Sequence, residues 1–201
     1  MWIMNVVWPI TALFGSALGF LGYMTFGRNK MTACAAKSDR QPPFSVAVGK
    51  GTTHCGAGCT LGDITAEWLA VIFPSVAVGF GWGSIFADKM FAVWVLDYLF
   101  AFAFGVAFQY FTIKPMRNLS AGAGLLAALK ADSLSLTCWQ IGMYGFMAFA
   151  HFYLFGELLK APLEVDTVEF WFMMQIAMLA GFVTAYPANW WLIKRGIKER
   201  M

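Results

Sequence analysis

Residues 90–113, MFAVWVLDYLFAFAFGVAFQYFTI, decide the fold, because this long apolar run contains a single charged residue, Asp97. A transmembrane α-helix needs about 20 predominantly apolar residues to cross a hydrocarbon core about 30 Å thick. The stretch is long enough, and the basic residue Lys114 follows it directly. We therefore expect a membrane-spanning helix here and interpret the rest of the chain around it.

The composition of the whole chain agrees with a membrane protein. Of its 201 residues, 60% are hydrophobic and 12% are charged, and the mean hydropathy is +0.64. Soluble domains carry about 25% charged residues. A water-soluble globule is therefore excluded, and the lipid bilayer is the expected partner. The modest net charge of +3 gives no reason to expect a nucleic-acid partner.

Four further apolar runs have the length of a membrane span, at residues 3–26, 67–87, 134–155 and 168–193. Pro74 and Pro187 lie inside two of them and should kink those helices. The sequence thus predicts an all-α, polytopic transmembrane helical bundle with five spans. Residues 1–26 form the first helix, 27–66 a cytoplasmic loop, and 67–201 a four-helix transmembrane domain. A short interfacial helix is expected near 120–131, with Asp132 or Ser133 capping the span that follows.

The distribution of lysine and arginine predicts the orientation, because cytoplasmic loops carry an excess of both. With five spans, twelve of the fourteen basic residues fall on one side of the membrane. They are Arg28, Lys30, Lys37, Arg40, Lys50, Lys114, Arg117, Lys130, Lys194, Arg195, Lys198 and Arg200. This pattern predicts an N-terminus outside the cell and a C-terminus in the cytoplasm.

The stretch GTTHCGAGCTLGDITAEW, residues 51–68, places His54, Cys55 and Cys59 close together in the predicted cytoplasmic loop, which also contains Cys34. The cytoplasm keeps thiols reduced. Thiolates and imidazole suit Cu(I) or Zn(II), so a metal site is one interpretation. The alternative is a glycine-rich loop packed at the membrane edge, with Asp63 capping the next span. Redox catalysis is less favoured, because a C-x₂-C pair is the usual device.

Polar groups inside the spans indicate a second candidate site. Counting from the outer ends of their helices places Asp97, His151 and Gln175 about 10 Å below the outer surface. Because buried ionisable groups in membranes need partners, we expect the Asp97 carboxylate to hydrogen-bond the His151 ring. The pair could be functional or only a satisfied structural contact.

Methionines accompany these polar groups. Met143 and Met147 share a helical face with Gln140 and His151, and Met174 and Met178 lie one turn apart on the last span. Thioethers with imidazole would suit a Cu(I) path. The alternative is that these methionines only fill gaps between packed helices.

Three segments of the chain resemble a prokaryotic membrane-protein family known only as a domain of unknown function. They read HCGAGCTLGDITAEW, KPMRNLSAGAGLLAALKADSLSLTCWQIGMYG and FWFMMQIAMLAGFVTAYPANWWLIKRGIKERM. The resemblance covers roughly residues 54–201 and implies a multi-pass protein of the prokaryotic cytoplasmic membrane. It transfers no activity and no catalytic residue. It also implies an association with copper-handling proteins, which favours copper among the possible metals.

The leading hypothesis is therefore the handling of a soft metal ion, most plausibly Cu(I), by transport or delivery. Asp97 and His151 with Met147 and Met174 would form an outer site. A cytoplasmic site would use the loop residues His54, Cys55 and Cys59. One alternative is a non-catalytic accessory or assembly subunit of a membrane complex, and another is a membrane thiol oxidoreductase. The sequence shows no nucleotide motif and no catalytic triad, so an enzyme is disfavoured.

Overall fold

The computed structural model describes residues 3–27 and 43–200, and the chain is 84% helix with no strand in the described part. An isolated bridge joins Trp82 and Phe86. The α-helices are α1 (Met4–Gly22), α2 (Phe44–Ile72), α3 (Pro74–Gly79), α4 (Lys89–Arg117), α5 (Ala121–Ala148) and α6 (Val168–Lys194). Two π-helical segments, η1 (Tyr23–Gly27) and η2 (Phe149–Leu159), continue α1 and α5.

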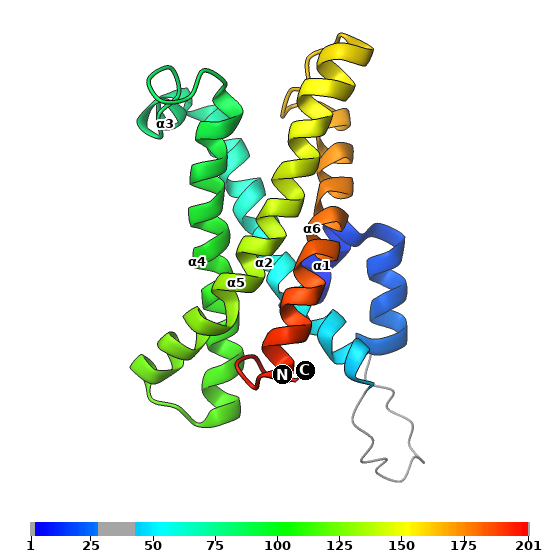
Figure 1. Cartoon of the computed structure of the whole chain (residues 1–201), viewed down its shortest axis with the longest axis vertical. Helices are drawn as coiled ribbons and strands as arrows, with labels where there is room; N and C mark the ends of the chain where they lie inside the picture. Colours follow the sequence, from blue (N-terminus) through cyan, green and yellow to red (C-terminus); the bar gives the residue numbers. More distant parts are fainter. Residues whose placement is uncertain (1–2, 28–42, 201) are drawn as a thin grey trace.

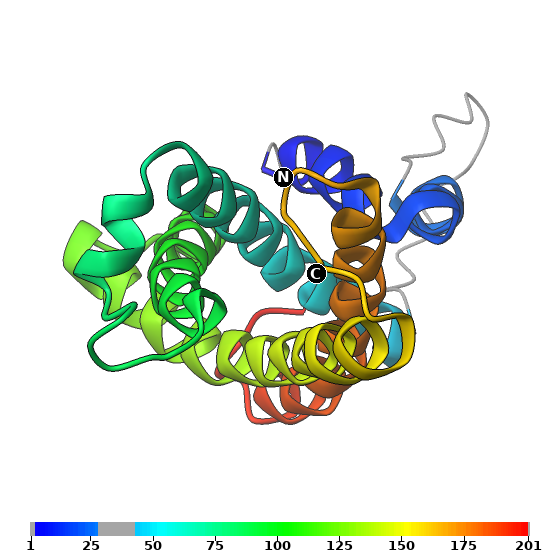
Figure 2. The ribbon, with the colours of Figure 1, turned by 90° about the horizontal axis from the view of Figure 1, so that it is seen from above.

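Four long helices form the body of the molecule (Figures 1 and 2). The chain runs up α2, down α4, up α5 with η2, and down α6, in the view of Figure 1. The most extensive contacts are those between α2 and α4 and between α5 and α6. We call the end where α2 and α5 begin and α4 and α6 finish the basic end, because Lys114, Arg117 and Lys194 lie there.

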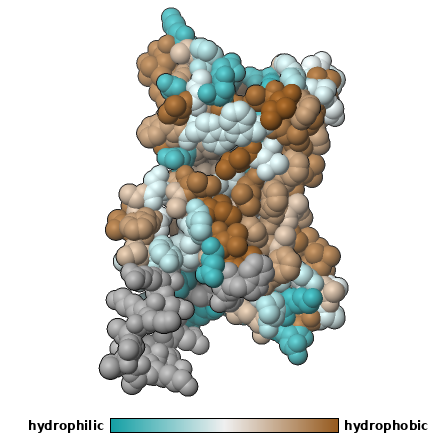
Figure 3. Space-filling view, turned by 180° about the vertical axis from the view of Figure 1, so that it is seen from behind, coloured by the Kyte–Doolittle hydropathy of each residue, from teal (hydrophilic) through white to brown (hydrophobic). Residues whose placement is uncertain are grey.

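Three helices of the described residues are long and apolar enough to cross a membrane: Met4–Thr25, Lys89–Arg117 and Val168–Lys194. The space-filling view agrees, since hydrophobic residues cover much of the middle of the face and hydrophilic residues gather mainly near its ends (Figure 3). The chain is therefore a membrane protein, and the predictions of spans at residues 90–113 and 168–193 match α4 and α6 closely.

The first helix is folded back on itself instead of forming the straight span expected over residues 3–26. Its backbone leaves the helical region at Ser16, where φ is 44° and ψ is −127°. As a result the rings of Trp8 and Tyr23 meet at a centroid distance of 5.6 Å. In a straight helix these two residues would be about 22 Å apart along the axis. The N-terminal segment is thus a helical hairpin with its bend at Ser16.

The predicted boundaries around the second span are also wrong. Residues 44–66, expected in a loop, belong to α2, which ends at Ile72. The apolar run at residues 67–87 is divided among the end of α2, the short α3 and a turn. The residue before a proline is pushed out of the helical region, and Phe73 accordingly has φ −126° and ψ 80° in front of Pro74. The proline therefore ends the helix where a kink was expected.

The predicted interfacial helix is the first part of α5 and continues into the next span without a break. Its N-cap is Ser120, whose hydroxyl accepts a hydrogen bond from the Ala123 amide. Asp132 and Ser133 therefore cap nothing: Asp132 is buried inside the bundle, and the Ser133 hydroxyl donates to the Leu129 carbonyl. The α-helical geometry ends at Ala148, and the π-helical segment η2 begins at Phe149.

Candidate functional site

One face of α2 carries the chemistry of the site. Cys55, Cys59, Asp63 and Glu67 follow one another at every fourth residue, so they share a face of the helix. All four are buried, with at most 6% of the residue exposed. The stripe runs from two thiols to two carboxyl groups, toward the end opposite the basic end. Ionisable residues inside a membrane protein are rare and commonly functional, so this stripe is a candidate site.

The carboxyl part of this stripe lies against α4 and α5. Asp63 interacts electrostatically with Asp97 of α4 and with Glu67, and it lies beside the Gln140 amide of α5. The Tyr144 hydroxyl of α5 donates to Asp97 Oδ2 at 3.0 Å and is 2.9 Å from the Trp94 carbonyl. Three carboxyl groups from two helices therefore interact electrostatically in this region.

Asp63 and Gln140 keep free hydrogen-bonding capacity in this region. Both carboxyl oxygens of Asp63 and both amide atoms of Gln140 are buried, and no hydrogen bond of normal length and angle satisfies them among the described residues, although Asp63 lies close to both Gln140 and Asp97. Buried polar groups are normally hydrogen-bonded, so such atoms call for a ligand or ordered water. The cluster is therefore a candidate site for a polar or charged ligand.

Four methionines share a hydrophobic core cluster with the thiol part of the stripe. Met143 and Met147 of α5 and Met174 and Met178 of α6 are at most 5% exposed. They belong to the same hydrophobic core cluster as Cys55 and Cys59. We call these six residues with Asp63 the sulfur–carboxylate cluster.

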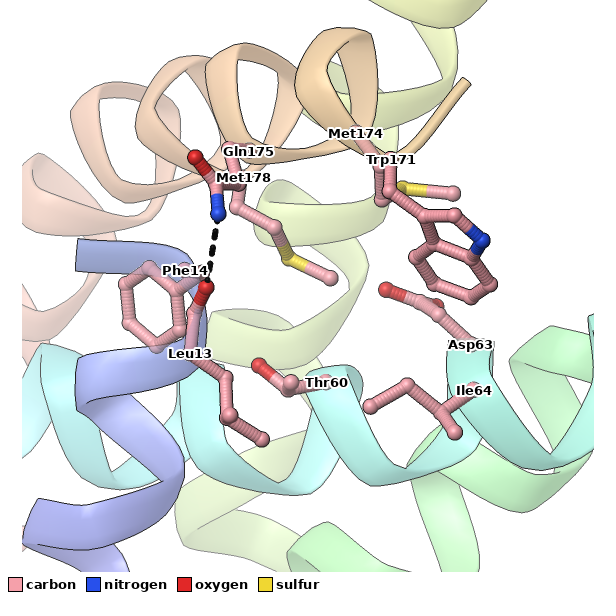
Figure 4. Close-up of a pocket in the computed structure, with 9 residues that line it drawn as sticks. All are labelled: Leu13, Phe14, Thr60, Asp63, Ile64, Trp171, Met174, Gln175 and Met178. Atoms are coloured by element: carbon pink, nitrogen blue, oxygen red, sulfur yellow. Dashed lines mark hydrogen bonds between the residues drawn. The ribbon is translucent and has the colours of Figure 1, made fainter. Parts of the chain in front are cut away.

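A cavity of about 230 Å³ opens beside this cluster, between α1, α2 and α6. Figure 4 shows Met174 and Met178 on the α6 side facing Thr60 and Asp63 of α2. Leu13 and Phe14, just before the bend of α1, line another part of the wall. The Gln175 amide donates to the Leu13 carbonyl at 3.2 Å, and this bond ties α1 to α6. The cavity thus combines thioether sulfurs, a hydroxyl and an unpartnered carboxyl group.

The expected pairing of Asp97 with His151 is absent. The His151 ring lies 3.2 Å from Asp88 Oδ2, while Asp97 bonds Tyr144. Asp88 precedes Asp97 by nine residues, which is about 14 Å along a helix. The His151 side chain is also partly exposed, whereas Met143 and Met147 are buried. Gln175 contacts α1 and does not join Asp97.

His54 does not join Cys55 and Cys59 either. Helical geometry turns neighbouring residues by about 100°, so His54 leaves the stripe of the thiols. Its Nε2 lies 3.1 Å from the Thr112 hydroxyl of α4, and its ring packs edge-on against Phe108. Within residues 3–27 and 43–200, no three His, Cys, Asp or Glu side chains are placed to hold a metal ion. Cys34, the remaining predicted ligand, lies outside the described residues.

Sequence reasoning missed Asp63, Glu67 and Tyr144 as members of the site. The signal was present in the four-residue spacing of Cys55, Cys59, Asp63 and Glu67. It was hidden because the segment's glycines and polar residues suggested a loop, so no helical periodicity was sought there. The shared face of Met174 and Met178, by contrast, was predicted from their spacing alone.

A family model matches residues 46–198, and the family is described as a domain of unknown function, DUF4396. The match begins at the start of α2 and extends into the tail after α6, so it includes the four long helices and excludes the α1 hairpin. No curated protein and no solved structure matches the chain.

Proposed function

The chain belongs to this family, whose description assigns no activity, and we propose that it handles a soft metal ion inside the membrane, namely Cu(I), by transport or delivery. The observation that carries the proposal is the cavity in which Met174 and Met178 face Asp63 (Figure 4). Thioether and thiolate ligands select Cu(I) over harder ions. Asp63 would supply the negative charge that balances the ion.

The donor set favours Cu(I) over Zn(II). Structural zinc sites use four ligands drawn from cysteine, histidine and carboxylates, and catalytic sites use three. No such group of three converges in the described part of the chain, whereas methionine sulfurs of two helices and two thiols share one packed cluster. In this proposal the ion enters between Met174 and Met178 and then reaches Cys59 and Cys55 along α2.

The buried thiols do not favour the thiol oxidoreductase hypothesis. Cys55 and Cys59 are fully buried, whereas thiol–disulfide exchange needs a sulfur that a partner thiol can reach. A non-catalytic accessory role, in which the polar groups only lock the helices together, is the outcome that remains if no metal binds.

The proposed topology has four crossing helices, α2, α4, α5 with η2, and α6, and its basic end faces the cytoplasm of a prokaryotic cell. The α1 hairpin would enter the bilayer from that side and return to it. This arrangement places the N-terminus in the cytoplasm, in contrast to the outside position that five straight spans require. The opening of the cavity between α1 and α6 would then lie within the membrane.

Cu(I) binding to the purified protein tests this function. Anaerobic competition against a coloured Cu(I) chelator should show saturable binding, and Met174→Leu with Met178→Leu should weaken it by roughly tenfold or more. The matched control is Met24→Leu with Met116→Leu, because both methionines are exposed. Cys59→Ser should weaken binding, whereas Cys138→Ser, which alters a partly exposed thiol, should not. Equal affinities for the native protein and all four variants, or no binding by the native protein, would refute the proposal.

A further inference from the structure

Lys198 lies three residues from the end of the chain, yet its side chain is fully buried. After α6 ends at Lys194, the backbone turns at Gly196, where φ is +69°. The chain then folds back so that the Lys198 amide donates to the Leu192 carbonyl at 3.3 Å. This turn directs the lysine into the bundle at its basic end.

Two acceptor atoms of α5 lie beside the lysine ammonium. Its Nζ lies 3.3 Å from Asp132 Oδ1 and 3.5 Å from the Ser135 hydroxyl, both on α5. The Asn189 amide of α6 donates to the same hydroxyl at 2.7 Å. Asp132 Oδ2 and Asn189 Oδ1 have no hydrogen-bond partner among the described residues, although both are buried. The site therefore offers more oxygen atoms than the lysine uses.

A second anchor holds the same tail from the side of α4. Arg117, at the end of α4, forms an ion pair with Glu199 and donates to the Gly196 carbonyl at 3.1 Å. Arg117 and Glu199 remain partly exposed, in contrast to Lys198 and Asp132. The tail residues 196–199 thus connect α4 to α5 across the basic end.

A buried ion pair is a poor way to gain stability, because the cost of removing both charges from water can exceed their attraction. Ionisable residues inside membrane bundles commonly mark ion pathways. We propose that Lys198 is a tethered cation that fills an inner cation site formed by Asp132, Ser135 and Asn189. The tail is then the plug that closes this site at the basic end. The site's ligand class is a monovalent cation of ammonium size, and the proposal does not depend on copper.

Chemical rescue tests the cation site. Lys198→Ala removes the equivalent of a propylammonium ion and should lower the thermal unfolding midpoint of the purified protein. Added propylammonium or ammonium should restore part of that loss saturably, whereas 1-propanol and equal concentrations of tetramethylammonium should not. The native protein and Lys198→Ala with Asp132→Ala should not respond to the cations. A Lys198→Ala protein that is indifferent to propylammonium would overturn the assignment.

Amine labelling tests the plug in the intact chain and stays informative if Lys198→Ala does not fold. An amine-reactive ester should modify Lys198 about tenfold or more slowly than the exposed Lys194, because a buried amine reacts only when the tail opens. Arg117→Gln should accelerate the labelling of Lys198 and leave Lys194 unchanged. Equal rates for the two lysines in the native protein would show that the tail is not docked, and the proposal would fail.

Discussion

Gly58 lies where the backbones of α2 and α4 touch. A Cβ atom at this position would be 2.7 Å from the Cα of Gly105. One turn later, a Cβ at Gly62 would be 2.5 Å from the Ala101 backbone nitrogen. Real side-chain atoms do not come this close, so only glycine permits the contact. The close approach brings Asp63 of α2 beside Asp97 of α4, and small residues are the usual means of such packing in membranes.

Replacing Gly58 by alanine should destabilise the fold. The added methyl group would force two backbones apart, at a cost of about 1–3 kcal/mol. Gly49→Ala is the matched control, because this glycine of α2 has no neighbouring atom within 4 Å of its Cβ position. The control should be neutral or stabilising by up to about 1 kcal/mol, the helix propensity difference. Unfolding of both variants in detergent measures the difference, and equal stabilities would contradict the close contact.

Single residues also show where sequence reasoning succeeds. Met174 and Met178 face one cavity, as their four-residue spacing predicted, because α6 keeps regular geometry across both positions. His151 does not pair with Asp97, and the chain that carries it switches to a π-helix at Phe149. Residue spacing does not predict such a switch. The contact of His151 with Asp88 also depends on where α4 begins, which spacing on α5 cannot give.

At the scale of elements, α4 and α6 were predictable and α2 was not. The first two are long apolar runs, for which the membrane alone dictates a helix. Residues 44–62 of α2 contain five glycines together with threonines and a histidine, which is typical of a loop in isolation. This segment is helical because α4, α5 and α6 pack around it, so tertiary contacts override a weak local propensity.

The α1 hairpin was also not predictable from the sequence. Here a straight helix was expected, and the structure has a bend. Its composition and length fit a straight span, and hydropathy alone cannot reveal a bend. The bend at Ser16 depends on contacts of α1 with α2 and α6. Its hydroxyl, for example, lies 3.4 Å from the side-chain oxygen of Gln175. A non-glycine residue with positive φ is uncommon, and such strain is concentrated at functional sites.

Reporter fusions test this fold-back of α1 and the four crossing helices together. Reporters at the N-terminus, after Lys89, after Arg117, after Lys160 and at the C-terminus should read inside, outside, inside, outside and inside. The expectation follows from the proposed topology, in which the basic end faces the cytoplasm and α1 returns to the side on which it entered. An N-terminal reporter outside the cell would contradict the hairpin and restore five straight spans.

At the scale of the whole molecule, two buried polar regions are connected by α2. The sulfur–carboxylate cluster begins at Cys55 and extends along α2, with Glu67 and Asp97 beyond it, toward the end opposite the basic end. The region around Lys198, Asp132 and His54 lies at the basic end. We propose that the two regions act in succession. A soft cation binds at the sulfur atoms, and the inner cation site, filled by Lys198, lies between that ion and the cytoplasm. Both regions combine residues from helices distant in sequence, so neither could be assembled from residue spacing alone.

The central claim is that α2, α5 and α6 together form a sulfur-lined Cu(I) site, and X-ray absorption of the copper-loaded protein tests it most directly. The spectrum should show a reduced copper ion with sulfur as the dominant neighbour. The sulfur contribution should fall in Met174→Leu with Met178→Leu and stay unchanged in Met24→Leu with Met116→Leu. Copper that is coordinated only by nitrogen and oxygen, or a protein that retains no copper after desalting, would contradict the account.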